Sequence, residues 1–309
     1  MVQAHQYNGL TWIDIESPNH AEIAEIVATC NLHPTVGDEL LNPSSEPKVE
    51  LHKGYVYLNL DVPSRIHHGH HGTIMKKELD FVVGKNFIIT VRYDAVEPLH
   101  NFSKVFETNA ILDKGSRNGM GEHAGFVFYY MLKRIYSHTR RDLGNIREDI
   151  QRAESRIYEG HEKRMVVVLS NIGREIIDAR QVLRTHGETL ELVGLAMEKL
   201  FGVAFRYQTD DLTSDYRKVE DDLTNLHELL GVMRDTNDSL LSSKQNETMK
   251  IFTMMAFITF PLSLFIALFA LPTTHVPIIG RPFDFEIIVG IIVLAILSML
   301  GFFKYKKWL

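Results

Sequence analysis

The chain has 309 residues, of which 45% are hydrophobic and 23% are charged, a composition typical of a globular protein with a sizeable core. The net charge of −6 argues against nucleic acid as a partner, because that function needs a basic patch and a high isoelectric point. The single cysteine, Cys30, excludes an internal disulfide and a multi-cysteine metal site, which fits a reducing, cytosolic setting. No apolar signal-peptide core occurs at the N-terminus.

The first part of the chain has mixed patterning. Short runs rich in β-branched and aromatic residues, bounded by Gly, Pro and Asn, predict strands at TWIDI, YVYLNLDV, ELDFVVG and FIITVR. Residues Asn19 to Cys30 have the periodicity of a helix. We therefore expect a cytoplasmic α/β domain over residues 1–120.

A histidine cluster, HHGHHG, falls between two of these predicted strands. Clustered imidazoles bind zinc-like ions, so His67, His68, His70 and His71 are candidate ligands of a cytoplasmic zinc sensor or buffer. The spacing fixes no ligand geometry, and a plain solvent-exposed hairpin loop is the alternative interpretation.

Long helices are predicted next, over a stalk region of residues 121–248. The first runs from about Glu122 to Tyr158 and is broken at Gly160, and the second runs from about Glu162 to Leu200. A third helix is expected to start near Asp210 or Asp211, which carry helix-capping side chains. Between Asp211 and Leu271 only Gly231 and Pro261 could break this helix, and a proline is tolerated inside a membrane span. One helix of about 60 residues, roughly 90 Å long, is therefore expected.

Two apolar runs near the C-terminus, the first uncharged and the second with Glu286 at its edge, predict a transmembrane hairpin over residues 249–309. The first span covers about 251–271, which reaches across about 30 Å of hydrocarbon, and the second covers about 285–303. Two buried core helices are the alternative. Lys250, Lys304, Lys306 and Lys307 flank the spans, whereas the loop has only Arg281, so the positive-inside rule predicts cytoplasmic termini. We expect an integral protein of the inner (plasma) membrane that contacts lipid. Because two spans are too few to enclose an ion path, we also expect self-association.

The segment that leads into the first span resembles that of the CorA magnesium transporters. The similarity is closest from Arg234 to Leu268, where the family's residue types stand at Asn246, Met249, Lys250, Thr253 and Pro261. The ending FFKYKKWL resembles the family's basic tail, and LHP at 32–34 and PKVE at 47–50 follow its soluble domain more loosely. The resemblance implies a funnel-shaped homopentamer, with a cytoplasmic α/β ring, a helical stalk and a pore lined by the first span.

One stripe of the long helix has side chains suited to such a pore. Asn246 and Ser263 offer oxygen atoms for a hydrated cation, and Met249 and Phe252 form an apolar constriction. The candidate pore-lining residues are Asp235, Asn246, Met249, Phe252, Thr253, Phe260, Ser263, Ala270 and Pro272. The alternative is that Met249 and Phe252 only pack within a bundle and that Asn246 sets its register.

The chain departs from the family at the outer end of the pore helix. Ala270, Leu271 and Pro272 stand where the family has Gly-Met-Asn, so its ring of amide oxygens is missing. Ligands could come instead from the loop, where His275 would favour Zn²⁺, Co²⁺ or Ni²⁺ over Mg²⁺. The alternative is that His275 is a solvated loop residue.

A regulatory metal site is a further implication of the resemblance. Asp211 matches a family position where an acid, paired with one from the adjacent subunit, binds Mg²⁺; its partner would lie near Asp94 or Glu97. The alternative is that Asp211 only caps its helix.

The sequence thus predicts membrane transport of Mg²⁺, Co²⁺, Ni²⁺ or Zn²⁺. A zinc transporter working by efflux or proton coupling, and a pore-inactive metal sensor or scaffold, remain alternatives. We expect no enzyme and no catalytic cofactor, because the sequence contains no phosphate-binding loop, HExxH motif or nucleophile elbow.

Overall fold

The computed structural model describes residues 2–7, 9–44, 46–68, 71–100, 102, 123–270, 278–280 and 282–306. The chain divides into two compact units, Met1–Arg234 and Asp235–Leu309. The three-part division expected from the sequence, with boundaries near 120 and 248, stays a prediction.

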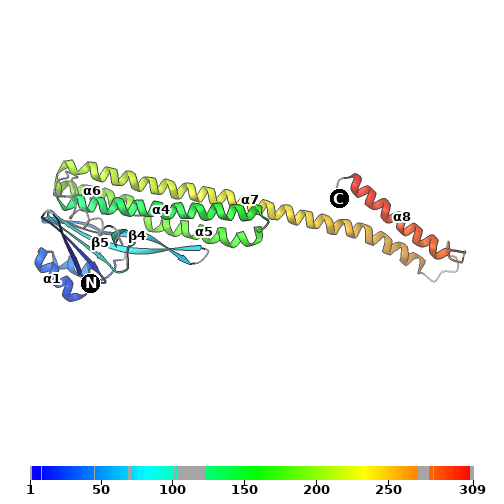
Figure 1. Ribbon diagram of the computed structural model, residues 1–309, viewed down its shortest axis with the longest axis horizontal. Coiled ribbons are helices and arrows are strands. Elements are labelled where there is room, and N and C mark those ends of the chain that lie inside the picture. Colours follow the sequence, from blue (N-terminus) through cyan, green and yellow to red (C-terminus); the bar gives the residue numbers. More distant parts are fainter. Residues whose placement is uncertain are drawn as a thin grey trace. The chain divides into compact units, whose positions relative to one another are not determined.

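A six-stranded sheet organises the first unit (Figure 1). Its strands are β1 (Val2–Tyr7), β2 (Leu10–Glu16), β3 (Val49–His52), β4 (Tyr55–His68), β5 (His71–Gly84) and β6 (Phe87–Arg92). They lie in the order β1-β2-β6-β5-β4-β3, and only the β2–β6 pair is parallel. The four strand-like runs in the sequence lie in β2, β4, β5 and β6, which confirms the predicted mixed α/β class.

Two short helices cover one face of this sheet. Helix α1 (His20–Cys30) begins at Asn19, whose side chain accepts from the Glu22 amide while Glu22 accepts from the Asn19 amide. Helix α2 (Pro34–Glu39) follows. Apolar side chains of both, including Ile23 and Val36, join one core cluster with residues of the sheet.

The opposite face is covered by helices of the stalk region: α4 (Ala124–Tyr158), α5 (Glu162–Leu183) and α6 (His186–Phe201). Phe128 of α4 packs edge-on against Phe81 of β5, with ring centroids 5.2 Å apart. Gly160 has a φ of 93°, a left-handed conformation that favours glycine, and it separates α4 from α5 as predicted.

The single helix expected over residues 162–200 is wrong, because the chain breaks after Leu183 and restarts at His186. The His186 ring is fully buried, and its Nε2 donates to the Asp61 carbonyl of β4. Its Nδ1 therefore accepts from the Tyr136 hydroxyl of α4, 3.0 Å away. This hydrogen-bonded histidine joins the start of α6 to the sheet and to α4.

Helix α7 (Arg206–Phe269) is one continuous helix of 64 residues that belongs to both units. It starts earlier than expected, so Asp210 and Asp211 lie inside it and do not cap it. In the first unit its apolar stripe is buried, at Leu212, Val219, Leu223, Leu226 and Leu230. Pro261 is accommodated within the helix, as predicted.

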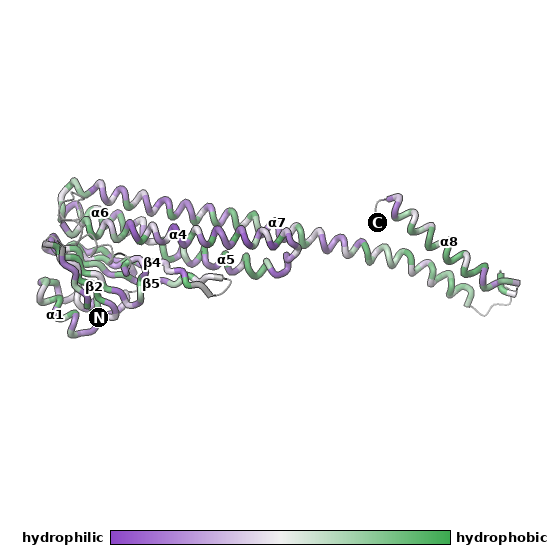
Figure 2. Tube along the Cα trace, viewed as in Figure 1, coloured by the Kyte–Doolittle hydropathy of each residue, from purple (hydrophilic) through white to green (hydrophobic). Residues whose placement is uncertain are grey.

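The second unit contains the end of α7 and α8 (Asp284–Tyr305). Figure 2 shows that both carry long hydrophobic stretches. By length and composition, α7 and α8 are the two described helices able to cross a membrane. Most of their large apolar side chains are exposed within the chain, so these are not the core helices of a soluble protein.

The buried His186 gives the first unit a pH-dependent stability. Burial lowers the pKa of His186 to about 4, so the unfolded chain binds a proton more readily than the folded one below pH 6.5. We predict that stability is full above pH 6.5 and falls as the pH drops toward 4. The loss at pH 5 should be about 2 kcal/mol.

Urea unfolding of the full-length protein in detergent, followed by Trp12 fluorescence in a Trp308→Phe background, measures this effect. A His186→Asn variant, which cannot titrate, should lose less stability between pH 7 and pH 5. Parallel losses in both proteins would contradict the assignment.

Candidate functional site

The candidate pore-lining residues lie on a face of α7 that the second unit leaves uncovered. Every residue from Ser242 to Thr253 is exposed, with Met249 and Phe252 exposed by 66% and 62%. Asp235 is exposed as well, and so are Phe260, Ser263 and Ala270 nearer the outer end. Pro272 and His275 lie outside the described residues.

The opposite face of α7 is less exposed and is called the covered face. Reduced exposure recurs every three or four residues, at Met254, Ile258, Leu262, Phe265 and Phe269. Helix α8 shows the matching pattern, at Ile288, Ile292, Ala295, Met299 and Phe303. At 100° per residue, the Asn246–Met249–Phe260 stripe is roughly half a turn away from this covered face.

The uncovered stripe offers few charges and several oxygen atoms. An Asn246 amide and a Ser263 hydroxyl can accept the waters or the ion of a hydrated cation, as hard cations require. The Thr253 hydroxyl donates to the Met249 carbonyl at 2.8 Å, so its remaining lone pairs can still accept. Met249 and Phe252 lie between these polar positions and would repel water from a narrow path.

Asp211 belongs to a charged cluster between α4 and α7. Its carboxylate accepts hydrogen bonds from the Tyr129 hydroxyl, at 2.6 Å, and from the Lys133 ammonium. Lys133 also lies 3.6 Å from Asp215. The hydrogen bonds from Lys133 and then Tyr129 lower the pKa of the Asp211 carboxyl, so this residue is ionised and already has a counter-charge.

The acids expected to complete a metal site with Asp211 come from another part of the fold. Asp94 is exposed just after β6, and Glu97 is exposed with its Oε2 4.0 Å from His138 Nε2. Among the described residues, no group of three or more His, Cys, Asp or Glu side chains is placed to hold a metal ion. The structure of one chain thus leaves these acids separate.

The histidine cluster lies at the tip of the β4–β5 hairpin. His67 and His68 end β4 and His71 starts β5, whereas His70 lies outside the described residues. The hairpin is held by a buried ionic cluster: Glu175 of α5 accepts from Arg65 Nε and from the Gly72 amide, each at 2.9 Å. Asp149 of α4 also accepts from Arg65. Sequence reasoning missed this cluster because its members are 84 to 110 residues apart.

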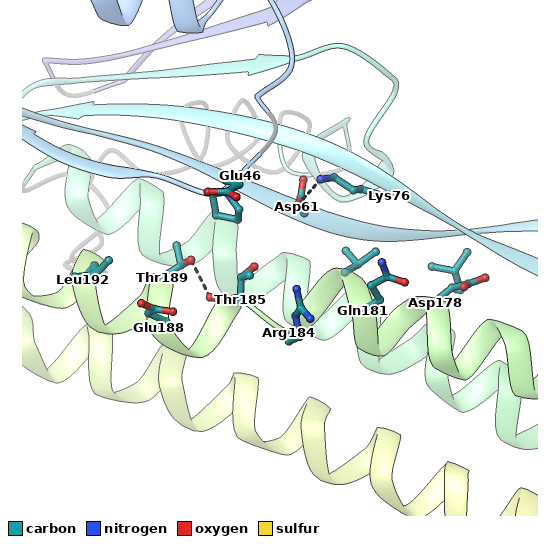
Figure 3. A pocket seen from close by; sticks show the side chains of 13 residues that line it. Glu46, Asp61, Lys76, Asp178, Gln181, Arg184, Thr185, Glu188, Thr189 and Leu192 are labelled. Atoms are coloured by element: carbon teal, nitrogen blue, oxygen red, sulfur yellow. Dashed lines mark hydrogen bonds and ion pairs between the residues drawn. The ribbon is translucent and has the colours of Figure 1, made fainter.

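A cavity of about 700 Å³ lies between β4–β5 and the junction of α5 and α6 (Figure 3). Its wall mixes both signs of charge: Asp61 pairs with Lys76 at 2.8 Å, and Asp178, Arg184 and Glu188 lie along the helices. Such a wall selects no single class of ion, so we assign it no part in the site.

Comparisons with known proteins agree with these features. Residues 7–307 match the family described as "CorA-like Mg2+ transporter protein". The cobalt/magnesium transport protein CorA of Thermotoga maritima is 20% identical over 303 residues, covering 97% of this chain and 83% of the relative.

Two solved structures share the fold over nearly the whole chain. The complete CorA magnesium transporter of Methanocaldococcus jannaschii matches with a TM-score of 0.81 at 19% identity, over 97% of this chain and 92% of that one. The full-length CmaX protein matches with a TM-score of 0.69 at 14% identity, over 97% and 89% of the two chains.

Because Asp211 is partly exposed, its ion pair should contribute little to stability, and this distinguishes a functional role from a structural one. Its side chain is 33% exposed and its partner Lys133 is 41% exposed, so we predict that Asp211→Ala changes the free energy of unfolding by less than about 1 kcal/mol. Asp14 is a matched control, because its buried carboxylate also has two partners, Arg92 at 3.0 Å and Thr90 at 2.6 Å.

Removing the Asp14 carboxylate leaves the buried Arg92 with only the more exposed Glu16, 3.2 Å away, as a counter-charge, so Asp14→Ala should cost about 3 kcal/mol. Urea unfolding curves of the two full-length variants give the comparison. A loss for Asp211→Ala as large as that for Asp14→Ala would show that Asp211 is a structural residue.

Proposed function

The chain belongs to the CorA-like Mg2+ transporter family, and on this premise we propose that it conducts divalent metal cations through a pore formed by α7 of several copies. It is therefore a membrane protein from a family of transporters and not of enzymes, as the sequence predicted. Transport needs no nucleotide or catalytic cofactor. A divalent ion that enters a cell with an inside-negative potential of 100 mV gains about 4.6 kcal/mol.

The uncovered stripe of α7 is the observation that carries this proposal. Hydrogen bonds within a membrane helix satisfy its backbone, so this face of α7 could simply contact lipid if it carried only apolar side chains. The stripe instead carries Ser263 inside the proposed span and Asn246 shortly before it. A polar side chain in a bilayer marks an ion pathway or a helix contact. Repetition of the stripe around an axis surrounds one path with amide, thioether, phenyl and hydroxyl rings.

We propose that the assembly is a homopentamer, the state implied by the resemblance to CorA transporters. The chain would lie in the inner (plasma) membrane with both termini in the cytoplasm, because Lys250 and the lysines after α8 flank the same side of the hairpin. The spans would be residues 251–271 and 285–303, which overlap the apolar ends of α7 and α8.

The transported metal depends on the outer end of the pore. Ala270, Leu271 and Pro272 offer no side-chain oxygen, so selection would pass to Ser263, Asn246 or the loop that carries His275. Imidazoles would favour Zn²⁺, Co²⁺ and Ni²⁺, whereas amide and hydroxyl oxygens suit hydrated Mg²⁺. A zinc transporter using efflux or a proton gradient is therefore the second candidate. A pore-inactive sensor or scaffold is the third.

Regulation by bound metal is proposed at Asp211, together with Asp94 or Glu97 of a neighbouring subunit. A cation bridging two subunits would stabilise a closed ring by mass action. Lys133 would weaken metal binding at this site, because its ammonium already forms an ion pair with the Asp211 carboxylate. The hairpin residues His67, His68, His70 and His71 are a separate proposed zinc site.

Flux into proteoliposomes tests the function directly. We expect uptake of at least one of Mg²⁺, Co²⁺, Ni²⁺ and Zn²⁺, each tested alone with an inside-negative potential, and no uptake by empty vesicles. Zinc flux that follows an imposed pH gradient would favour the proton-coupled transporter. The absence of flux for all four ions would favour the scaffold.

The gate is tested by making the constriction polar. We predict that Met249→Ser and Phe252→Ser each raise the rate of metal flux at least several-fold, because hydroxyls let water enter an apolar constriction. The matched control is Ile251→Ser, which makes a similar change at the same depth about half a turn away from Met249. Equal effects at Met249 and Ile251 would place the path elsewhere.

A further inference from the structure

The first unit contains a second cavity, of about 680 Å³, whose wall is basic. Four of its side chains are cations of α4: Lys133, Arg134, Arg140 and Arg141. One carboxylate, Asp215 of α7, lies among them, and it is already paired with Lys218 at 2.7 Å. This concentration of positive charge is unexpected in a chain with a net charge of −6.

The four cations differ in whether they already have partners. Lys133 bonds Asp211, and Arg140 Nε donates to Asp222 at 2.8 Å, so both have structural counter-charges. Arg134 and Arg141 are exposed, and neither makes an ion pair within the described part of the chain. They are seven residues apart on one helix, which puts both guanidinium groups on the same face, about 10 Å apart along the axis.

Hydroxyl and aromatic groups complete the wall. Ser137 lies between the two arginines on the same face, and the half-buried Tyr130 lies one turn before Arg134. A guanidinium binds phosphate oxygens in a bidentate fork, and a hydroxyl adds one more donor. The volume is within the range of small-molecule sites.

We propose that this cavity binds a multiply charged phosphate anion, held by Arg134 and Arg141 at two points along α4. The shared chemistry is a chain of phosphates, which a nucleoside triphosphate and inorganic tripolyphosphate both provide. In the nucleotide, the base would contact the half-buried aromatic ring of Tyr130, which also lines the cavity. This binding site goes beyond the proposed transport, which needs no phosphate.

Calorimetric titration of the full-length protein in detergent tests the site, with ATP and tripolyphosphate as separate probes and no divalent metal present. We expect saturable binding that weakens as salt rises, because the contacts are ionic. Tighter binding of ATP would identify a nucleotide as the preferred source, and equal binding would identify the phosphate chain alone. Both results support the site.

The decisive variant is the double substitution Arg134→Ala and Arg141→Ala, which leaves the ion pairs of Lys133 and Arg140 in place. We expect it to weaken binding at least about tenfold, the value of one charge-assisted hydrogen bond. The matched control, Arg147→Ala with Arg164→Ala, removes two exposed arginines outside the cavity and should change the affinity less than about twofold.

Two results would overturn the proposal. One is the absence of saturable binding of either probe by the wild-type protein at low salt. The other is an equal loss of affinity in the test and control variants, which would mean that the anion responds only to overall charge. Because all four arginines are exposed, unfolding temperatures measured beside the titration should stay close to wild type.

Discussion

The exposed apolar face of α7 must be covered by something other than its own chain, and the arrangement of the second unit depends on what covers it. Helices α7 and α8 each have one less exposed face, marked by residues such as Met254 and Phe303. The other face of α7 keeps Met249, Phe252 and Phe260 exposed. At about 25 cal/mol per Å², such side chains do not stay in water, so lipid or further protein must cover them. The polar residues in the same stripe favour protein around a hydrated axis over lipid.

The first unit supplies a rigid support for the same helix. The α7 stripe from Leu212 to Leu230 is buried, so this half of the helix is fixed by packing. Polar contacts over long sequence distances join its neighbours to the sheet, through His186 and through Arg65 with Glu175. Because α7 is one helix without interruption, its packing in the first unit and its exposed stripe in the second belong to the same element.

The elements with regular periodicity were predictable from sequence, whereas contacts between distant residues were not. The mixed α/β class, the long helix and the two apolar helices followed from pattern and length. The break before His186 was missed, since helical periodicity runs through it and the hydrogen bond from His186 to Asp61 joins residues that are 125 positions apart. The early start of α7 was missed because Asp210 and Asp211 imitate a helix cap. The sequence did not indicate that Lys133 is the partner of Asp211, because the two residues are 78 positions apart.

Disulfide cross-linking in native membranes tests most directly whether the uncovered stripe of α7 surrounds an axis. Single cysteines are introduced in a Cys30→Ser background at Asn246, Met249 and Thr253, and for comparison at Met254, Ile258 and Leu262 on the covered face. We expect mild oxidation to link copies of the chain at the first three positions and to leave the variants at the last three positions monomeric. Cross-linking at the covered positions alone would contradict it.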